Sequence, residues 1–173
     1  MLKSQTISLR APELSDVDLL YEWENDESIW LLSNTLTPFS RFALEQYIMN
    51  ASLDIYSAKQ LRLMIDLLSG EHIVTIGTID LFDFSPLHRR AGVGILIDST
   101  YRSQGYASEA MELMIEYAFS TLQLHQLYCN ISSENQASLK LFKKFGFEVV
   151  GIKKDWLSID NRWTDEYLLQ LIH

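Results

Sequence analysis

The stretch GILIDSTYRSQGYASEAMELMIEYAF, residues 94–119, decides the fold. It opens on the end of a short apolar run, residues 93–97, which is typical of a buried strand. From Ala107 onward, small and apolar residues recur every three or four positions and predict one face of a helix. A helix start carries unpaired N–H groups and a partial positive charge, and Gly105 lets the backbone approach a ligand closely. The stretch therefore predicts a turn that binds an anion such as phosphate. The alternative is an ordinary capped helix that follows a loop glycine.

The whole chain predicts a mixed α/β sheet in one domain that spans residues 1–173. Alternating or continuously apolar runs predict the strands, and the turn sequence SGEH separates two of them. Asn135 is expected to cap a helix, and Gly146 is expected to end it in a left-handed conformation. Strands are expected at residues 6–10, 61–68, 73–82, 93–97, 127–131, 147–153, 156–159 and 163–172, helices at 17–23, 42–51, 107–118 and 135–145, and loops at 25–40 and 83–90.

Composition excludes several classes of protein. Of 173 residues 47% are hydrophobic, which indicates a globular chain. No apolar run approaches the ~20 residues that a membrane span needs, so no membrane partner is expected. Fourteen basic residues against 23 acidic ones give a net charge of −9, which argues against a nucleic-acid partner and is compatible with a cationic substrate. The first residues, MLKSQTISLRAPE, lack the apolar segment of an export signal, so a cytoplasmic location is expected.

The single cysteine and the four histidines indicate neither a disulfide nor a metal site. Cys129 has no second cysteine to pair with in the chain and lies in the middle of a predicted strand, so it predicts a core thiol rather than a nucleophile. The histidines show no spacing typical of metal ligands. No metal is expected.

Four ordered segments together resemble one enzyme family. The R-x-x-G-x-A pattern over residues 102–107 follows the segment LHRRAGVGILID, residues 87–98. SENQASLKLFKKFGFEVVG and NRWTDEYLLQLI come later, at residues 133–151 and 161–172. This combination is similar to the GNAT superfamily of acetyl-CoA-dependent N-acetyltransferases and covers roughly residues 6–172. Within it, the chain most resembles the spermidine and ribosomal-protein N-terminal acetyltransferases.

The resemblance implies a fold and a cofactor site. It implies a mixed, mostly antiparallel sheet flanked by helices, which splays between the strands at residues 93–97 and 127–131. Acetyl-CoA would enter this opening, and a primary amine of a small molecule or a peptide would attack it directly from the other side. A homodimer is also expected. The residues implied to contact CoA are Ile95, Leu96 and Ile97 along the pantetheine, Arg102, Ser103, Gln104, Gly105, Tyr106 and Ala107 around the pyrophosphate, and Asn135 and Phe142 beside the arm and thiol.

Two positions depart from the family pattern. Phe142 stands where many relatives carry a tyrosine that protonates the leaving thiolate, and Gly92 stands where many carry a glutamate. Asp80, Asp83 and His88 are the substitute candidates for a base that works directly or through a held water molecule. Each is also typical of an exposed side chain. Tyr106 and Tyr128 are further candidates near the thiol.

The acceptor and the function stay open at this level. Trp23, Trp30 and Phe39 could line an acceptor pocket, or they could pack the first two helices. Residues 33–40, SNTLTPFS, lack the carboxylates found there in polyamine acetyltransferases, which argues against a polyamine acceptor. The function predicted first is an N-acetyltransferase. The alternative, favoured by Phe142 and Gly92, is a non-catalytic domain that binds or senses acyl-CoA.

Overall fold

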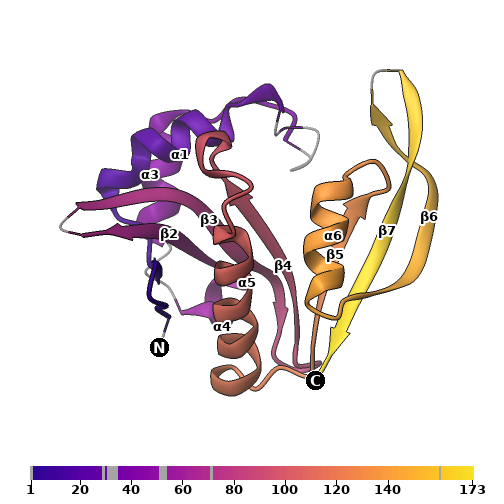
Figure 1. Ribbon diagram of the computed structural model, residues 1–173. Coiled ribbons are helices and arrows are strands. Elements are labelled where there is room, and N and C mark those ends of the chain that lie inside the picture. The colour runs from indigo at the N-terminus through magenta and orange to yellow at the C-terminus, as the bar shows by residue number, and fades with distance from the viewer. Residues whose placement is uncertain (1, 29, 31–34, 51–53, 71, 160) are drawn as a thin grey trace.

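The computed structural model describes all of the chain except residues 1, 29, 31–34, 51–53, 71 and 160. Its centre is a seven-stranded sheet in the order β1-β2-β3-β4-β5-β7-β6 (Figure 1). The strands are β1 (Ile7–Arg10), β2 (Leu61–Ser69), β3 (His72–Ser85), β4 (Arg90–Ile97), β5 (Gln126–Ser132), β6 (Glu148–Ile159) and β7 (Arg162–Ile172). The main helices are α1 (Val17–Glu24), α3 (Arg41–Asn50), α4 (Ile55–Ala58), α5 (Tyr106–Glu116) and α6 (Gln136–Lys144).

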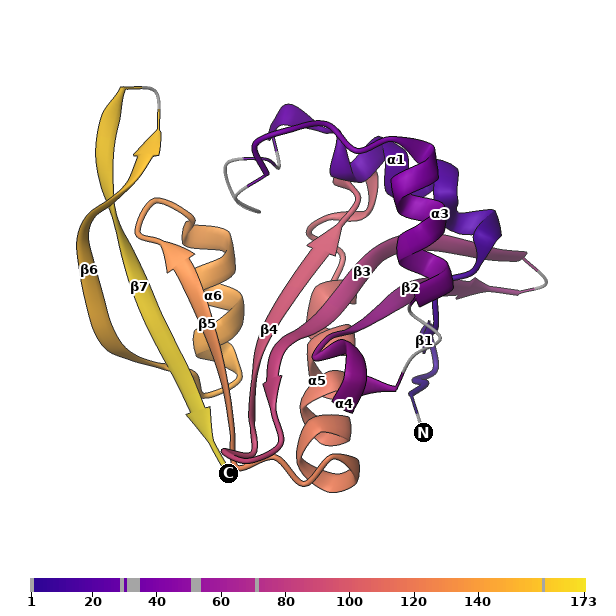
Figure 2. The same cartoon turned by 180° about the vertical axis from the view of Figure 1, so that it is seen from behind.

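The two halves of the sheet meet at one parallel junction. β4 and β5 pair only at Arg90 with Gln126, Ala91 with Leu127 and Gly92 with Tyr128, whereas every other neighbouring pair of strands is antiparallel. Beyond Gly92 the two strands separate, and the opening between them is visible from behind (Figure 2). The predicted fold, a mixed and mostly antiparallel sheet that splays at this point, is confirmed.

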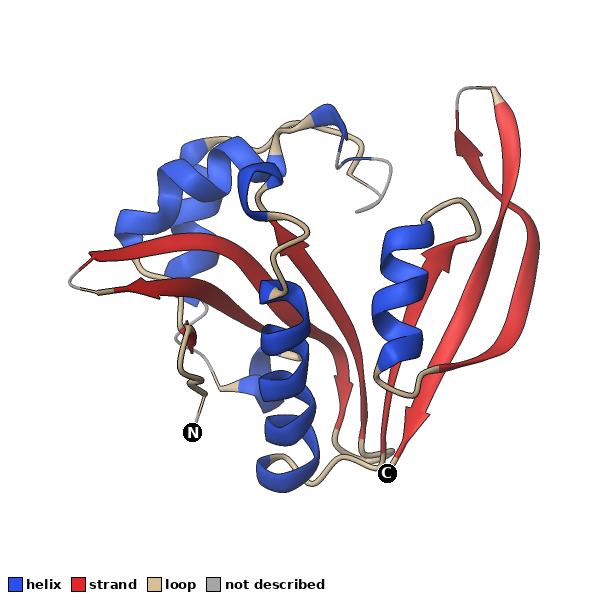
Figure 3. Cartoon of the chain, in the orientation of Figure 1, coloured by secondary structure: helices blue, strands red, loops and turns tan. Residues whose placement is uncertain are grey.

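Helices cover both faces of the sheet. In the two views, α5 lies on one face of β3 and β4, and α1 and α3 lie on the opposite face (Figure 3). α6 packs on the second half of the sheet, beside β5. Among the described residues, no helix is long and apolar enough to cross a membrane.

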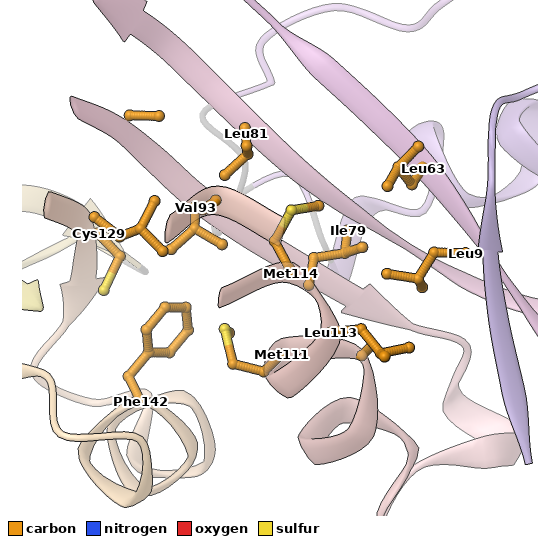
Figure 4. Packing of buried hydrophobic residues seen from close by; sticks show 14 of the residues in the cluster. Leu9, Leu63, Ile79, Leu81, Val93, Met111, Leu113, Met114, Cys129 and Phe142 are labelled. Carbon is orange, nitrogen blue, oxygen red and sulfur yellow. The ribbon is translucent and has the colours of Figure 1, made fainter. Parts of the chain in front are cut away.

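The larger hydrophobic core fills the space between α5, α6 and the sheet. Met111 and Met114 of α5 lie against β3 and β4, and Phe142 of α6 lies close to Cys129 and faces Val93 (Figure 4). All five residues are buried. A second, smaller cluster lies on the other face and consists of Val17, Leu20, Trp23, Leu44, Ile48 and Met64. The apolar face predicted for the helix after Gly105 is therefore the face that builds the core.

Two strand boundaries differ from the prediction. β3 continues through Asp83 to Ser85, and β4 already begins at Arg90, so the predicted loop is reduced to the turn at residues 86–89. Asp83 has a φ of +50°, and the register shifts between Phe82 and Ser85. A bulge adds a residue to one strand and interrupts the alternation of side chains. The hydrophobic pattern therefore stops before the strand does.

The C-terminal hairpin is also longer than predicted. The segments predicted as separate strands at 147–153 and 156–159 form one strand, β6, with a register shift between Lys153 and Leu157. At this irregularity Asp155 has a φ of +48°, and its N–H donates to Asp165 Oδ1 at 3.0 Å. The short helix α4 was not predicted, because four residues are too few to show a period. Ala51, the last residue of the helix predicted at residues 42–51, lies outside the described residues.

Candidate active site

A cleft of about 160 Å³ lies where β4 and β5 separate. It is lined from both halves of the molecule, because β4 contributes one wall and β5, α6, β6 and β7 contribute the other. The lining residues are Val93, Gly94, Ile95, Cys129, Asn130, Ile131, Ser132, Asn135, Ser138, Phe142, Leu157 and Glu166. The cleft therefore unites the strand and the helix that the resemblance placed on either side of a cofactor.

The free edge of β4 forms one wall of the cleft. Beyond Gly92, the backbone of β4 has no partner strand on the side of β5 in the described part of the chain. Ile95 lines the cleft, whereas Leu96 packs against the second hydrophobic cluster and Ile97 is buried in the larger core. A ligand that paired with this edge would use backbone groups, so it would not need all three side chains.

The start of α5 has the geometry of an anion site. Gly105 has a φ of +94°, and a Cβ built there would meet no atom within 4 Å. None of the hydrogen bonds of the described residues gives an acceptor to the backbone N–H groups between Ser103 and Ala107. Unpaired N–H groups at a helix start favour phosphate. The residues present therefore fit the pyrophosphate of CoA.

Side chains hold the loop that leads into α5. Arg102 is exposed, and its Nε donates to the Ile97 carbonyl at 2.9 Å. Asp98 accepts from the backbone N–H of Thr100 at 2.8 Å and from Trp23 Nε1 at 3.0 Å. The bond from the Thr100 N–H and the bond from Trp23 together keep the pKa of Asp98 below its usual value. Trp23 thus connects α1 to the loop.

One basic residue near this site was missed from the sequence. Lys144, in the last turn of α6, donates from Nζ to Ser108 Oγ at 3.0 Å. It therefore brings a positive charge from α6 to the first turn of α5. Lys144 belongs to another helix, so spacing along the chain carries no signal for this contact.

The residues of α6 at the cleft are well ordered by packing and capping. Phe142 is 3% exposed, and its ring meets that of Phe147 edge to face. Asn135 Oδ1 accepts from the Ser138 N–H at 3.1 Å, which confirms the predicted helix cap. At the start of α5, the hydroxyl of Tyr106 donates a long hydrogen bond to Gln104 Oε1 at 3.5 Å.

Cys129 lines the cleft as a buried thiol. Burial raises its pKa to about 12. Because the thiolate is the nucleophilic form, this thiol is inert at neutral pH. The prediction of a core thiol agrees with this environment.

Gly92 leaves room for an aromatic ring. A Cβ at Gly92 would lie 2.2 Å from Cε2 of Phe82. The Phe82 ring, on β3, packs edge to face against Tyr128 of β5, with centroids 6.0 Å apart. At the position where relatives carry a glutamate, this chain has an aromatic pair that closes the junction of the two half-sheets.

The predicted proton acceptors are Asp80 and Asp83 on β3 and His88 in the turn that follows it. None of the three lines the cleft in the described structure. Asp80 accepts two bonds from Arg62, at 2.8 and 3.0 Å, and Arg62 also binds Glu24. Burial alone would lower the pKa of Arg62, but Asp80, Tyr47 and Glu24 together raise it above its usual value. Asp80 is therefore a member of a fixed ion-pair network.

Asp83 and His88 have different surroundings. The hydroxyl of Tyr128 donates to Asp83 Oδ2 at 2.9 Å. Burial and this carboxylate raise the pKa of Tyr128 to about 12, so the phenol stays protonated at neutral pH. His88 is exposed in the turn between β3 and β4. The structure thus brings Asp83 and Tyr128 together and leaves His88 apart.

The aromatic residues predicted at the acceptor side lie in and after α1. Trp23 is buried in the second cluster, which is the packing role that the sequence left open. Trp30 donates from Nε1 to the Glu24 carbonyl at 2.8 Å, and the Phe39 N–H donates to Asn25 Oδ1 at 2.8 Å. Phe39 is 38% exposed. Of the segment SNTLTPFS, residues 33 and 34 lie outside the described part.

A polar group inside the cleft was also missed. Glu166 of β7 lines the cleft and is 6% exposed. Lys153 Nζ donates to Glu166 Oε2 at 2.7 Å and to Asn130 Oδ1 at 3.0 Å. The alternation along β7 separates Asp165 from Glu166, but a sequence cannot say which of them faces the cleft. In the described residues, no group of three or more His, Cys, Asp or Glu side chains could hold a metal ion.

Comparisons with known proteins agree on one family. Residues 6–148 match the model of the acetyltransferase (GNAT) domain. The chain is 26% identical over 154 residues to the spermidine N(1)-acetyltransferase of Escherichia coli (strain K12), covering 87% of this chain and 77% of that protein. It is 26% identical over 171 residues to the uncharacterized N-acetyltransferase p20 of Bacillus licheniformis, and the match covers 99% of this chain and 95% of that protein.

A solved structure shows the same fold. The spermidine N-acetyltransferase from Vibrio cholerae, in complex with CoA and spermine, superimposes with a TM-score of 0.83 at 22% identity, over 98% of this chain and 96% of that one. The fold, the splayed sheet and the family match thus agree with the resemblance seen in the sequence. The chain belongs to the GNAT family of acetyltransferases.

Proposed function

We propose that this acetyl-CoA-dependent N-acetyltransferase transfers its acetyl group to a primary amine that meets the thioester inside the cleft. The observation that carries the proposal is the cleft between the two half-sheets. Its walls come from the unpaired edge of β4 on one side and from β5, α6, β6 and β7 on the other. The loop that follows β4 leads to the unpaired N–H groups at the start of α5. A cofactor bound along β4 and an amine that enters between the half-sheets could therefore meet in this cleft.

The chain's residues would hold the cofactor along this path. The pantetheine would pair with the backbone of residues 95–97, and the pyrophosphate would bind at residues 102–107. Asn135 and Phe142 line the end of the cleft on the side of α6. When bound, acetyl-CoA supplies an activated acetyl group and a good leaving group, since a thiol has a pKa of about 8.5.

The acceptor nitrogen has to lose a proton before it reacts. An ordinary primary amine has a pKa near 10.4, so only about one molecule in two thousand is neutral at pH 7. The nitrogen lone pair forms the new C–N bond while the C–S bond breaks and sulfur keeps the electron pair. The nitrogen releases two protons in all, and the thiolate regains one from solvent. The water relay through Asp80, Asp83 or His88 stays a prediction for the first of these protons.

The acceptor class is a small or peptidyl primary amine. The spermidine acetyltransferases to which the chain is similar act on a polyamine, and a net charge of −9 attracts cations. Carboxylates are absent from residues 33–40 of the sequence, which favours an acceptor with fewer charges than a polyamine. The homodimer also stays a prediction, and light scattering of the purified protein would test it.

The test is thiol release with a panel of acceptors. Acetyl-CoA is mixed with spermidine, an L-amino acid amide or a seryl peptide, and free thiol is measured against a blank without amine. We expect at least one amine to release thiol at a rate more than about tenfold above the blank, as the oriented attack requires. Tight binding of acetyl-CoA with no thiol release for any amine would instead support the sensing domain.

Replacing Phe142 with tyrosine tests how the thiolate is protonated. The ring lines the cleft, so the added hydroxyl of Phe142→Tyr would lie beside the sulfur of bound CoA and supply a proton donor to it. We expect turnover that is unchanged or higher, with unchanged affinity for CoA. A loss of turnover beyond about tenfold, with CoA affinity retained, would show that the shape of Phe142 is itself required.

A further inference from the structure

We propose that the Glu166 carboxylate binds the nitrogen of the acceptor amine and positions it in the cleft. This inference rests on the proposed function and names a group that recognises the substrate. It concerns a residue on the hairpin of β6 and β7, far in sequence from the cofactor loop. Three observations support it: the place of the carboxylate, the bonds that fix it, and the oxygen that those bonds leave free.

Glu166 lies where the two halves of the sheet have separated, beside the last residue of β5. It lines the same cleft as Val93 of β4 and Phe142 of α6. Its cross-strand partners are Ser132 on one side and Lys153 on the other. Of the acidic side chains in the described part of the protein, Glu166 is the one that lines this cleft.

Lys153 holds the carboxylate, and two further contacts hold Lys153. Lys153 Nζ donates to Glu166 Oε2 at 2.7 Å and to Asn130 Oδ1 at 3.0 Å. The Lys153 ammonium also lies 5.1 Å from the centre of the Trp156 ring. A carboxylate whose partner is itself held in place loses less freedom when it binds a ligand, so the site is partly organised in advance.

The second oxygen is free to bind a ligand. Among the described residues, no hydrogen bond reaches Glu166 Oε1. No fully buried side-chain oxygen in the described structure lacks a partner, so Oε1 keeps some accessible surface, and the cleft is the open space that Glu166 lines. An accessible carboxylate oxygen on a nearly buried residue needs a donor, and the N–H groups of an amine are suitable donors.

The nearby lysine limits how strongly the carboxylate favours a charged amine. A carboxylate in contact with the nitrogen favours the ammonium, whereas the positive charge of Lys153 opposes it. Lys153 therefore offsets part of the preference of Glu166 for the ammonium. Either form of the amine donates N–H to Oε1, so Glu166 can bind the nitrogen before and after it loses its proton.

The next residue provides a matched control. Asp165 precedes Glu166 on β7 and has a lysine partner of its own, because Lys154 Nζ donates to Asp165 Oδ2 at 2.7 Å. Successive side chains on a strand face opposite sides, and Asp165 does not line the cleft. Asp165→Asn thus removes a carboxylate from the same strand without changing the cleft.

The experiment measures amine binding separately from turnover. The variant Glu166→Gln keeps one oxygen for Lys153 and turns an NH₂ group, which cannot accept a hydrogen bond, toward the cleft. The protein saturated with CoA, which cannot react, is titrated calorimetrically with the best acceptor from the panel of spermidine, amino acid amide and seryl peptide. The kcat and KM values are then measured with acetyl-CoA.

We expect Glu166→Gln to weaken amine binding by about 10- to 100-fold, because a hydrogen bond to a charged group is lost. The dissociation constant of CoA should stay within about twofold, and Asp165→Asn should match the wild type in both measurements. If Glu166→Gln fails to bind CoA, the inference is judged on Glu166→Asp, which shortens the reach by one methylene and should weaken amine binding by about tenfold. Amine affinity within about threefold of wild type, in a variant that binds CoA normally, would overturn the inference.

The two proposals fail in different ways. A wild-type protein that releases no thiol with any amine would overturn the proposed function and this inference together. A wild-type protein that does acetylate an amine, with an unaffected Glu166→Gln variant, would overturn the inference alone. A loss confined to kcat, with amine binding intact, would likewise contradict a role in binding.

Discussion

The variant Gly105→Glu is expected to bind CoA about a thousandfold more weakly than the wild type, as measured by calorimetry. A Cβ at Gly105 would point into open space beside the unpaired N–H groups of α5. A carboxylate there would lie a few ångströms from the proposed pyrophosphate. Two like charges at 4 Å cost about 4 kcal/mol at an effective dielectric constant of 20, and each 1.4 kcal/mol is about tenfold in affinity.

A second glycine separates this effect from backbone strain. Gly70, in the turn between β2 and β3, also has a positive φ, +61°, and also has no atom within 4 Å of a Cβ. Gly70→Glu therefore adds the same side chain, also at a positive φ, in the turn between β2 and β3. It should bind CoA as the wild type does. If Gly105→Glu and Gly70→Glu bound CoA equally well, the proposal that the pyrophosphate binds at the start of α5 would be wrong.

The variant Gly92→Ala is expected to lower the free energy of unfolding by about 3 kcal/mol, at the upper end of the cost of overpacking. The new methyl group would lie 2.2 Å from Cε2 and 2.5 Å from Cζ of Phe82, so the ring has to move. That ring also packs on Tyr128 and closes the junction of β4 and β5. For a chain of this size, the melting temperature should fall by about 6–12 °C.

Gly94→Ala is the matched control for this prediction. Gly94 lies two residues further along β4, and a Cβ there would meet Phe82 Cε1 at 3.6 Å, an ordinary contact. Its melting temperature should stay close to that of the wild type. Combining Gly92→Ala with Phe82→Ala should cost less than the sum of the two single changes, because the clash is gone. If the losses in unfolding free energy were additive, the clash with Phe82 would not be the reason why residue 92 has to be a glycine.

Much of the fold follows from local patterns in the chain. Gly146 has a φ of +84°, and Asn135 caps α6, as their residue types predicted. The helix after Gly105 buries the apolar face that its period indicated. These features depend on neighbours within a few residues, which is the range over which a sequence can be interpreted directly.

The parts that escaped prediction depend on contacts between distant segments. Phe82 explains Gly92, and Lys144 reaches Ser108, only because the sheet brings them together. Glu166 faces the cleft because of the register of β7 against β5. A shift of one residue in this register would have turned Asp165 toward the cleft instead of Glu166. Register between strands is set by the whole sheet, so the residues of this cleft could not be chosen from their spacing.

The parallel junction of β4 and β5 has a consequence for the lifetime of the protein in the cell. Only three residue pairs join the two halves of the sheet, so a ligand paired with the β4 edge would act as a missing strand. A ligand that binds only the folded state stabilises it by about 2.7 kcal/mol at a hundred times its dissociation constant. Resistance to proteolysis would then rise and fall with the total supply of CoA and its thioesters, because the pantetheine arm is common to them all.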